Sequence, residues 1–240
     1  MIGFKIKIAD RVISINVFHE STKKYCEKFL TDKKPTYYIT MREEDLLNEA
    51  SNSVEGKVYA DEEISALYRK IAELFINDNI VVFHGSSFKV DNFGFIVTAK
   101  SGVGKSTHVK LLEEHLGDKF KYINDDKPLL EIRNDNLILH STPWNGKERR
   151  GTEVSSVPLK AIIFLNRGEE NSYQKLENKE EVYFKLLNQV YLPREKDMRE
   201  KALKIIDVII KKANFYEINV NKDIKSAQMT YERIIKDEIK

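Results

Sequence analysis

The first part of the chain alternates between apolar and polar residues. This period of two occurs in Phe4–Ile8 and again in Arg11–Val17, with Ala9-Asp10 between them. Side chains that alternate in this way lie on opposite faces of a strand, so the pattern predicts a β-hairpin with one buried face. Pro35–Thr40 is a candidate third strand, whereas the polar, unpatterned stretch Leu46–Gly56 is predicted to be a loop.

The period changes after Ala60. Apolar side chains then recur at steps of three and four residues, at Ile64, Leu67, Tyr68, Ile71, Leu74 and Phe75. This spacing places them on one face of a helix, and the acidic residues 61–63 suit its positive first turn. Packing against the core is a sufficient role for this helix.

The rest of the chain mixes short apolar runs with helical patterns. Strands are predicted at Ile80–Phe83, Phe95–Thr98, Phe120–Ile123, Leu129–Ile132, Leu137–His140, Ala161–Leu165 and Phe215–Val220. Helices are predicted at Val109–Leu116, closed by Gly117, and at Val182–Leu187, Ala202–Ile210 and Ala227–Ile235. This mixture predicts an α/β (mixed α+β) fold around a central sheet. Residues 1–79 are expected to form a β-hairpin and helix extension on a main domain of residues 80–240.

Composition narrows the classes of partner. The 240 residues are 41% apolar, which is enough for one substantial core. The 40 basic and 38 acidic residues nearly cancel, so neither a nucleic acid nor a membrane surface is an expected partner. Cys26 is the only cysteine, which excludes an intrachain disulfide and a cysteine-rich metal site. Without a signal core or an apolar run near ~20 residues, a cytoplasmic protein is expected.

The segment Ala99–Thr107 has the form of a Walker A phosphate-binding loop. It follows the predicted strand Phe95–Thr98 and precedes a predicted helix, which is the context that such a loop needs. The one departure is Ala99, which stands where a glycine is usual. A glycine-rich turn that arose by chance is the alternative, and the flanking strand and helix favour phosphate binding.

Each part of this loop has a chemical reason. Gly102 and Gly104 allow backbone angles that point N–H groups inward, and the helix that follows aims its positive end at the same anion. Lys105 adds a charge near the β- and γ-phosphates, and the Ser106 hydroxyl can complete the coordination of Mg²⁺. The ligand predicted is ATP, or another nucleoside triphosphate, with Mg²⁺. The candidate nucleotide-binding residues are Lys100, Ser101, Gly102, Val103, Gly104, Lys105, Ser106 and Thr107.

Two further polar clusters could supply catalytic, metal-binding or substrate-binding groups. Asn124-Asp125-Asp126 follows a predicted strand, so one aspartate could hold Mg²⁺ while the other accepts a proton. An ordinary turn at a strand end is the alternative. In the charged segment 143–152, Arg149 and Arg150 could bind phosphate or an acidic substrate group, and Glu148 could serve the metal. A solvated loop would explain the same charges.

Taken in order, these features resemble the catalytic domain of the HPr kinase/phosphatase family, whose sheet and phosphate loop are similar to those of phosphoenolpyruvate carboxykinase. Members of that family carry a His-Gly pair, a glycine-rich Gly-Lys-Ser loop, an Asp-Asp pair and a Glu-x-Arg-Gly segment. The corresponding residues here are His84-Gly85, Ala99–Ser106, Asp125-Asp126 and Glu148-Arg149-Arg150-Gly151, within the matched range Ile80–Leu165. The resemblance implies a P-loop kinase core.

The resemblance also implies roles for single residues. Asp125 would be the proton acceptor, His84 a catalytic or phosphate-contacting residue, and Lys105 the γ-phosphate ligand. Ser106 and Glu148 would hold Mg²⁺. Thr107 stands where the family usually has an acidic residue, and residues 1–79 do not resemble its regulatory domain. The acceptor expected is therefore not HPr but a hydroxyl, such as a serine, on another protein, a peptide or a small molecule.

The leading hypothesis is an ATP- and Mg²⁺-dependent kinase that transfers the γ-phosphoryl group to this hydroxyl. A nucleotide-binding regulatory protein with little turnover is the main alternative. A carboxykinase acting on a small carboxylic acid ranks last, because only Arg149-Arg150 stands out as a substrate-binding pair. The N-terminal part is open between a peptide-binding surface, a dimer surface of a homo-oligomer and a cover for the sheet.

Overall fold

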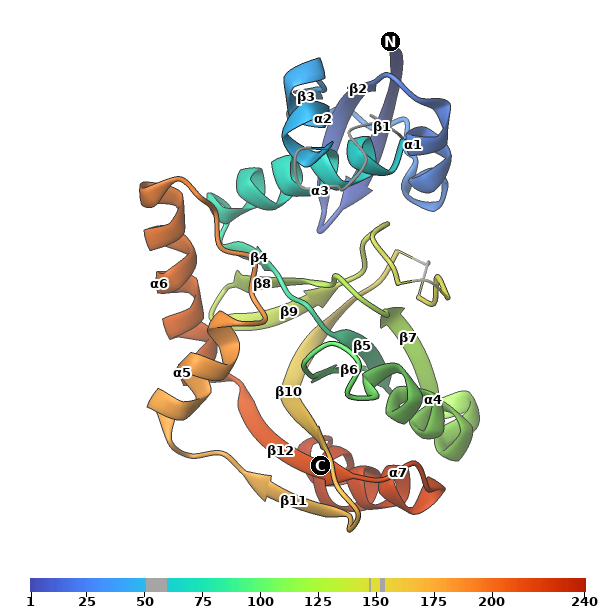
Figure 1. The fold of residues 1–240 in the computed structure, drawn as a ribbon, viewed down its shortest axis with the longest axis vertical. Helices are drawn as coiled ribbons and strands as arrows, with labels where there is room; N and C mark the ends of the chain where they lie inside the picture. The colour runs from blue at the N-terminus through green and yellow to red at the C-terminus, as the bar shows by residue number, and fades with distance from the viewer. Residues whose placement is uncertain (51–59, 147, 152–153) are drawn as a thin grey trace.

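A computed structural model describes residues 1–50, 60–146, 148–151 and 154–240 (Figure 1). Its strands are β1 Ile2–Ile8, β2 Arg11–Val17, β3 Tyr37–Thr40, β4 Ile80–Val82, β5 Ser86–Val90, β6 Phe93–Thr98, β7 Phe120–Asn124, β8 Leu129–Arg133, β9 Asn136–His140, β10 Ser156–Arg167, β11 Ser172–Lys175 and β12 Asn214–Val220. Its helices are α1 Glu20–Tyr25, α2 Glu43–Ala50, α3 Ala60–Ile76, α4 Lys105–Leu116, α5 Lys179–Leu187, α6 Lys196–Lys212, α7 Ile224–Thr230 and α8 Lys236–Glu238, with the short turns η1 Glu27–Phe29, η2 Gly117–Lys119 and π-helical η3 Tyr231–Ile235. Within these described ranges, no helix is both long and apolar enough to span a bilayer.

The N-terminal hairpin and its third strand are confirmed. β1 and β2 pair antiparallel, and β3 adds to β2 in parallel. The two-residue turn between β1 and β2 is formed by Ala9 and Asp10, both with positive φ (48° and 62°). Two central residues with positive φ form the turn type that matches the twist of a hairpin.

Helix α3 is also confirmed and joins the N-terminal sheet to the rest of the molecule. Its buried side chains, among them Leu67 and Phe75, pack in the same hydrophobic cluster as residues of β1 and β2. That cluster also contains Ile80 of β4, Leu129 of β8 and Trp144. The two predicted parts of the chain therefore share a hydrophobic core.

The predicted loop Leu46–Gly56 is wrong over its first five residues, because helix α2 runs from Glu43 to Ala50. Leu46 and Ala50 are buried, and α2 packs along α3. The ammonium group of Lys70 on α3 lies 2.8 Å from a carboxylate oxygen of Asp45. Packing and ion pairing thus give a polar segment the helical structure that its own pattern did not indicate. Residues 51–56 lie outside the described residues.

A mixed sheet of nine strands forms the main body of the protein. Strand β10 belongs to two parts of it. Residues 156–158 pair antiparallel with β9, which continues to β8 and β4, whereas the rest of β10 pairs in parallel with β6 and with β12. Beyond β6 lie β5 and then β7, both in antiparallel pairs, and β11 pairs with β12.

Helices cover both faces of this sheet (Figure 1). Side chains of α5 and α6 pack in one hydrophobic cluster with β4, β8 and β9, whereas α4, α7 and η3 pack in another with β5 and β12. The helices predicted after residues 99–107 are all present, and α4 begins at Lys105, four residues before the apolar stretch Val109–Leu116.

The pairing directions bring the polar ends of five strands to one edge of the sheet. β10 and β12 run parallel to β6, so the ends of these three strands lie together. β5 is antiparallel to both β6 and β7, so its first residues lie beside the ends of those two strands. The loop after β6, the residues before β5 and those after β7 therefore meet.

Candidate functional site

The segment between β6 and α4 folds as a compact loop. Gly102 and Gly104 have φ of 79° and 118°, a left-handed region that glycine adopts without strain. Helix α4 begins directly after Gly104, so its unpaired N–H groups lie at the loop. Ala99 has no positive φ, and its side chain packs in the core. An alanine therefore fits where the motif usually has glycine.

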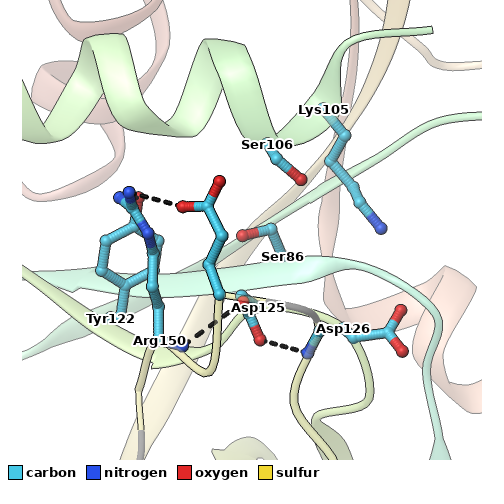
Figure 2. Close-up of a pocket in the computed structure, with 9 residues that line it drawn as sticks. Ser86, Lys105, Ser106, Tyr122, Asp125, Asp126 and Arg150 are labelled. Atoms are coloured by element: carbon cyan, nitrogen blue, oxygen red, sulfur yellow. Dashed lines mark hydrogen bonds and ion pairs between the residues drawn. The ribbon is translucent and has the colours of Figure 1, made fainter. Parts of the chain in front are cut away.

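Two adjoining cavities lie at this edge of the sheet. The loop cavity, of about 440 Å³, is lined by His84, Ala99, Lys100, Ser101, Gly102, Gly104, Lys105, Ser106, Thr107, Asp126 and Gly146. The carboxylate cavity, of about 280 Å³, is lined by Ser86, Lys105, Ser106, Tyr122, Asp125, Asp126, Gly146, Glu148 and Arg150. Lys105 and Ser106 line both cavities, and Figure 2 shows them at the start of α4, facing Asp125 and Asp126.

Backbone N–H groups hold the Asp125 carboxylate in the second cavity. Oδ1 accepts a hydrogen bond from the N–H of Gly146 at 2.6 Å, and Oδ2 accepts one from the N–H of Arg150 at 3.3 Å (Figure 2). Burial raises the pKa of Asp125, and these hydrogen bonds oppose the rise without cancelling it. Asp125 is thus a buried carboxylate with a strengthened affinity for a proton.

The pKa of the neighbouring carboxylate, Asp126, is shifted in the opposite direction. One oxygen of Asp126 lies 3.4 Å from Nε2 of His84 and 3.1 Å from Nζ of Lys127. Burial raises the pKa of Asp126, but hydrogen bonds from His84 and Lys127 outweigh it and lower the pKa to about 2. Asp126 therefore stays negatively charged under all ordinary conditions.

The turn that carries both aspartates is fixed by Asn124, which is fully buried. Its Oδ1 accepts hydrogen bonds from the N–H groups of Asp126 and Lys127, and its amide nitrogen donates to the carbonyl oxygens of Thr142 and Trp144. The segment is an Asx turn, which the sequence left as the alternative to a functional role, and the same residue ties that turn to Thr142 and Trp144.

His84 lies beside the phosphate-loop segment because β5 follows it directly. Strand β4, which ends before His84, pairs with β8, and a separate strand, β5, forms the hairpin with β6. Gly85 fits this close pairing, because a Cβ there would lie 2.7 Å from the side chain of Ile96.

The backbone of His84 is held on both sides. Its N–H donates to the carbonyl oxygen of Gln189 at 2.6 Å, and its carbonyl accepts from the Thr98 hydroxyl at 2.8 Å. The same hydroxyl lies 2.7 Å from Oε1 of Gln189. The His84 ring then reaches Lys105, whose Nζ lies 3.5 Å from Nε2. Burial lowers the pKa of Lys105, and attraction to Asp126 opposes this.

The structure separates the two adjacent arginines. The Arg150 guanidinium contacts Glu113 and the Tyr122 hydroxyl at 2.8 Å each, and Glu148 at 2.6 Å, within the carboxylate cavity. Arg149 has a φ of 50° and lies over the ring of Tyr25, 4.7 Å from its centroid. Arg149 therefore lines a different cavity, between α1 and the loop 143–149, and does not reach the two cavities at the sheet edge.

Three residues of this site were not predicted from the sequence. Ser86 and Tyr122 line the carboxylate cavity, and Gln189 positions His84. Serine, tyrosine and glutamine are common on any surface, so their residue types carry no signal. Only their positions would have indicated Ser86 and Tyr122. Ser86 begins β5 next to the His-Gly pair, and Tyr122 lies near the end of β7, before the aspartates.

The oxygen donors present fit a magnesium ion. Ser106, Asp126 and Glu148 all line the carboxylate cavity, although Glu148 is paired with Arg150. Among the described residues, no cluster of three or more histidine, cysteine, aspartate and glutamate side chains has the geometry of a metal site. Mg²⁺ needs fewer protein ligands than that, because it keeps several waters and takes oxygens from substrate phosphates.

Comparisons with known proteins add little to this geometry. No protein-family model and no curated protein matches the chain. Among solved structures, the chain is similar to the HPr(Ser) kinase/phosphatase from Coxiella burnetii, with 12% sequence identity and a TM-score of 0.40. That similarity covers 66% of this chain and 90% of the other. A similarity of this size identifies neither a reaction nor a substrate.

Proposed function

We propose that the protein is a kinase that transfers the γ-phosphoryl group of ATP, or of another nucleoside triphosphate, to a hydroxyl group. The acceptor would be a serine of a protein or peptide, or a small molecule. One observation carries the proposal. Two consecutive carboxylates, Asp125 and Asp126, face Lys105 at one cavity edge, and their pKa values are shifted in opposite directions. Such a divergence separates a proton acceptor from a permanent anion.

The loop cavity would bind the triphosphate. Its glycines leave room for phosphate oxygens, and the N-terminus of α4 supplies N–H groups and a positive potential. Lys105 lies where this cavity meets the carboxylate cavity, so its ammonium group would contact the γ-phosphate and neutralise charge that develops during transfer. His84, 3.5 Å from Lys105, would orient that ammonium group or contact the same phosphate.

The carboxylate cavity would bind the acceptor hydroxyl. Asp125 accepts its proton as the hydroxyl oxygen bonds to the γ-phosphorus, and the bond from that phosphorus to the bridging oxygen breaks. The nucleoside diphosphate leaves with the electron pair of that bond. The backbone hydrogen bonds to Asp125 hold its carboxylate in place, so little reorganisation is needed.

Ser106 and Asp126 would hold Mg²⁺, with Glu148 as a third donor once its pairing with Arg150 is released. An ion held by these residues would supply positive charge to offset that of the phosphate groups. The low pKa of Asp126 suits this role, because the ligand must be deprotonated.

One observation favours the alternative, a nucleotide-dependent regulatory protein with little turnover. The Arg150 guanidinium is already bonded to Glu113, Glu148 and Tyr122, so it is not free to bind a substrate anion. In that case the protein would bind a nucleotide without transferring its phosphoryl group.

The two functions can be separated with labelled nucleotide. The purified protein is incubated with γ-labelled ATP, Mg²⁺ and a cell lysate, and labelled acceptors are identified by mass spectrometry. We expect a labelled hydroxyl that disappears with both Lys105→Ala and Asp125→Asn, while Asp125→Asn retains nucleotide affinity. Slow hydrolysis without a labelled acceptor would favour the regulatory protein. Transfer that survives Asp125→Asn would show that the role given to Asp125 is wrong.

A further inference from the structure

A third hollow lies against the phosphate-loop segment. It measures about 170 Å³ and is lined by Gly102, Val103, Gly104, Thr107, His108, Leu165, Arg167, Val220, Asn221 and Lys222. Three of these residues, Gly102, Gly104 and Thr107, also line the loop cavity. The two spaces therefore adjoin at the glycine turn, although the carboxylate cavity shares none of the lining of the hollow.

The order of the strands places this hollow on the other side of β6 from Asp125. Asp125 follows β7, which lies beyond β5 on one side of β6, whereas β10 and β12 lie on the other side (Figure 1). The residues that end β10 and follow β12, Arg167 and Asn221, line the hollow. A nucleotide whose γ-phosphate faces Asp125 would extend its other end toward β10 and β12.

The walls of the hollow suit a flat, uncharged ring. Leu165 and Val220 are buried and supply apolar surface. Arg167 is held at the rim by a hydrogen bond of 3.2 Å from its Nη2 to the carbonyl oxygen of Gly102. A guanidinium group fixed in this way offers a planar surface on which an aromatic ring can stack.

The wall also contains the polar residues Thr107, His108, Asn221 and Lys222, and of these the Asn221 side chain is held by two hydrogen bonds. The Asn221 amide nitrogen donates to the carbonyl oxygen of Glu169 at 3.1 Å, and its Oδ1 accepts from the N–H of Asp223 at 3.0 Å. These bonds fix the shape of the wall. Among the residues that the structure describes, no aspartate or glutamate lines the hollow, so the lining offers no carboxylate to the donor groups of a base.

We propose that this hollow binds the nucleobase of the triphosphate, which stacks on the Arg167 guanidinium over an apolar floor. The inference rests on the proposed function, since the phosphates must occupy the loop cavity. At about 170 Å³ the hollow is smaller than the roughly 300–1,000 Å³ of ligand pockets. It therefore accommodates one ring system, and the adjoining loop cavity accommodates the phosphates. Recognition by stacking accepts adenine and guanine alike.

The test compares ATP with inorganic tripolyphosphate, which has the phosphates but no nucleoside. Dissociation constants are measured by calorimetry with Mg²⁺ for the full chain and for the variants Arg167→Ala and Arg167→Lys. Arg167→Lys keeps the positive charge but loses the planar guanidinium group. Lys121→Ala, which removes an exposed charge from β7, is the matched control. We expect Arg167→Lys to weaken ATP about tenfold, to leave tripolyphosphate within about twofold, and to weaken GTP as much as ATP.

The outcomes separate the two proposals. A wild-type protein that binds neither ligand overturns the proposed function itself. Equal losses for ATP and tripolyphosphate would show that Arg167 serves the phosphates, and unchanged ATP affinity in both variants would show that the base lies elsewhere. Either result overturns the inference and leaves the kinase proposal standing.

Discussion

The backbone N–H of Gly146 donates a hydrogen bond of 2.6 Å to the Asp125 carboxylate. This contact joins the end of β7 to the loop that carries Arg150, whose own N–H bonds the other oxygen of the same carboxylate. The proton acceptor of the proposed reaction is therefore positioned by main-chain groups, which no side-chain substitution removes directly. Its protonation then depends chiefly on burial.

The raised pKa of Asp125 predicts the acid limb of the rate profile. Asp125 acts as a base only when deprotonated, so the rate at saturating nucleotide falls as pH drops through its pKa. Since burial raises that pKa, the midpoint should lie above the ordinary value of 3.8. Phosphoryl transfer measured from pH 4 to 8 with an identified acceptor checks this. A rate that stays constant across that range would remove Asp125 from the role.

Gly151 should be intolerant of a side chain for two reasons. Its φ is 72°, and a Cβ would lie 2.5 Å from the backbone carbon of Ile123. Gly117 also has a positive φ of 53° but nothing within 4 Å, so Gly117→Ala isolates backbone strain, about 1–3 kcal/mol. We expect Gly151→Ala to lower the free energy of unfolding by more than Gly117→Ala, and also to reduce transfer by displacing Asp125. Urea denaturation and rate measurements compare them. Equal losses of stability would contradict the steric argument.

The two neighbouring arginines should differ in function. The Arg150 guanidinium holds Glu148 and Tyr122 in the wall of the carboxylate cavity, so Arg150→Ala should disturb that wall, lower kcat/KM for the acceptor by about tenfold and leave nucleotide affinity unchanged. Arg149 lies over Tyr25, so Arg149→Ala should leave both quantities within about twofold. Steady-state kinetics with varied acceptor measure the difference. The assignment fails if Arg149→Ala has the larger effect on kcat/KM.

A buried carboxylate ties the N-terminal hairpin to the main sheet. Glu131 on β8 accepts hydrogen bonds from Arg11 at 2.7 Å, from Arg133 at 2.6 Å and from His140 at 2.8 Å. Burial raises the pKa of Glu131, but hydrogen bonds from these partners, foremost His140, outweigh it and lower the pKa to about 2. Because the folded-state pKa is depressed, the stabilisation is complete above the ordinary value of 4.5 and is lost as pH falls toward 2.

Glu131→Gln should therefore be less stable than the wild type at pH 7, by about 1.5–3 kcal/mol, the range for hydrogen bonds to a charged group. The difference should shrink between pH 4.5 and pH 2, since the wild type loses its charged form there. Denaturant unfolding at several pH values measures both. Glu232→Gln, which removes an exposed carboxylate paired with Lys236, is the control and should change little. A constant difference between wild type and Glu131→Gln across this range would contradict the linkage.

Periodicity predicted those elements whose burial follows one face. The alternation in β1 and β2 and the helical spacing in α3 each reflect a buried face, and the structure confirms them. Strand β11 was missed because all four of its residues are exposed, so pairing with β12 alone makes it a strand. Helix α2 was missed because its stability comes from contacts with α3 rather than from its own sequence pattern.

The candidate site likewise combines features visible in the local sequence with features that depend on how distant segments pack. The loop 99–107 and the aspartates after β7 could be proposed from the sequence because each motif is a run of consecutive residues. The hairpin that places His84 beside Lys105 was not predicted, because β5 begins with two buried serines that gave no strand signal. The divergence of Arg149 from Arg150 depends on one backbone angle, the φ of 50° at Arg149, which residue type does not fix.

The hairpin that brings His84 to Lys105 turns at Asp91 and Asn92, both exposed, at the opposite end of β5 and β6. A fluorophore or affinity handle attached at this turn would lie a full strand length away from the two cavities proposed to bind nucleotide and acceptor. Labelled protein of this kind could be immobilised or followed by fluorescence while the two cavities at the other edge of the sheet stay accessible.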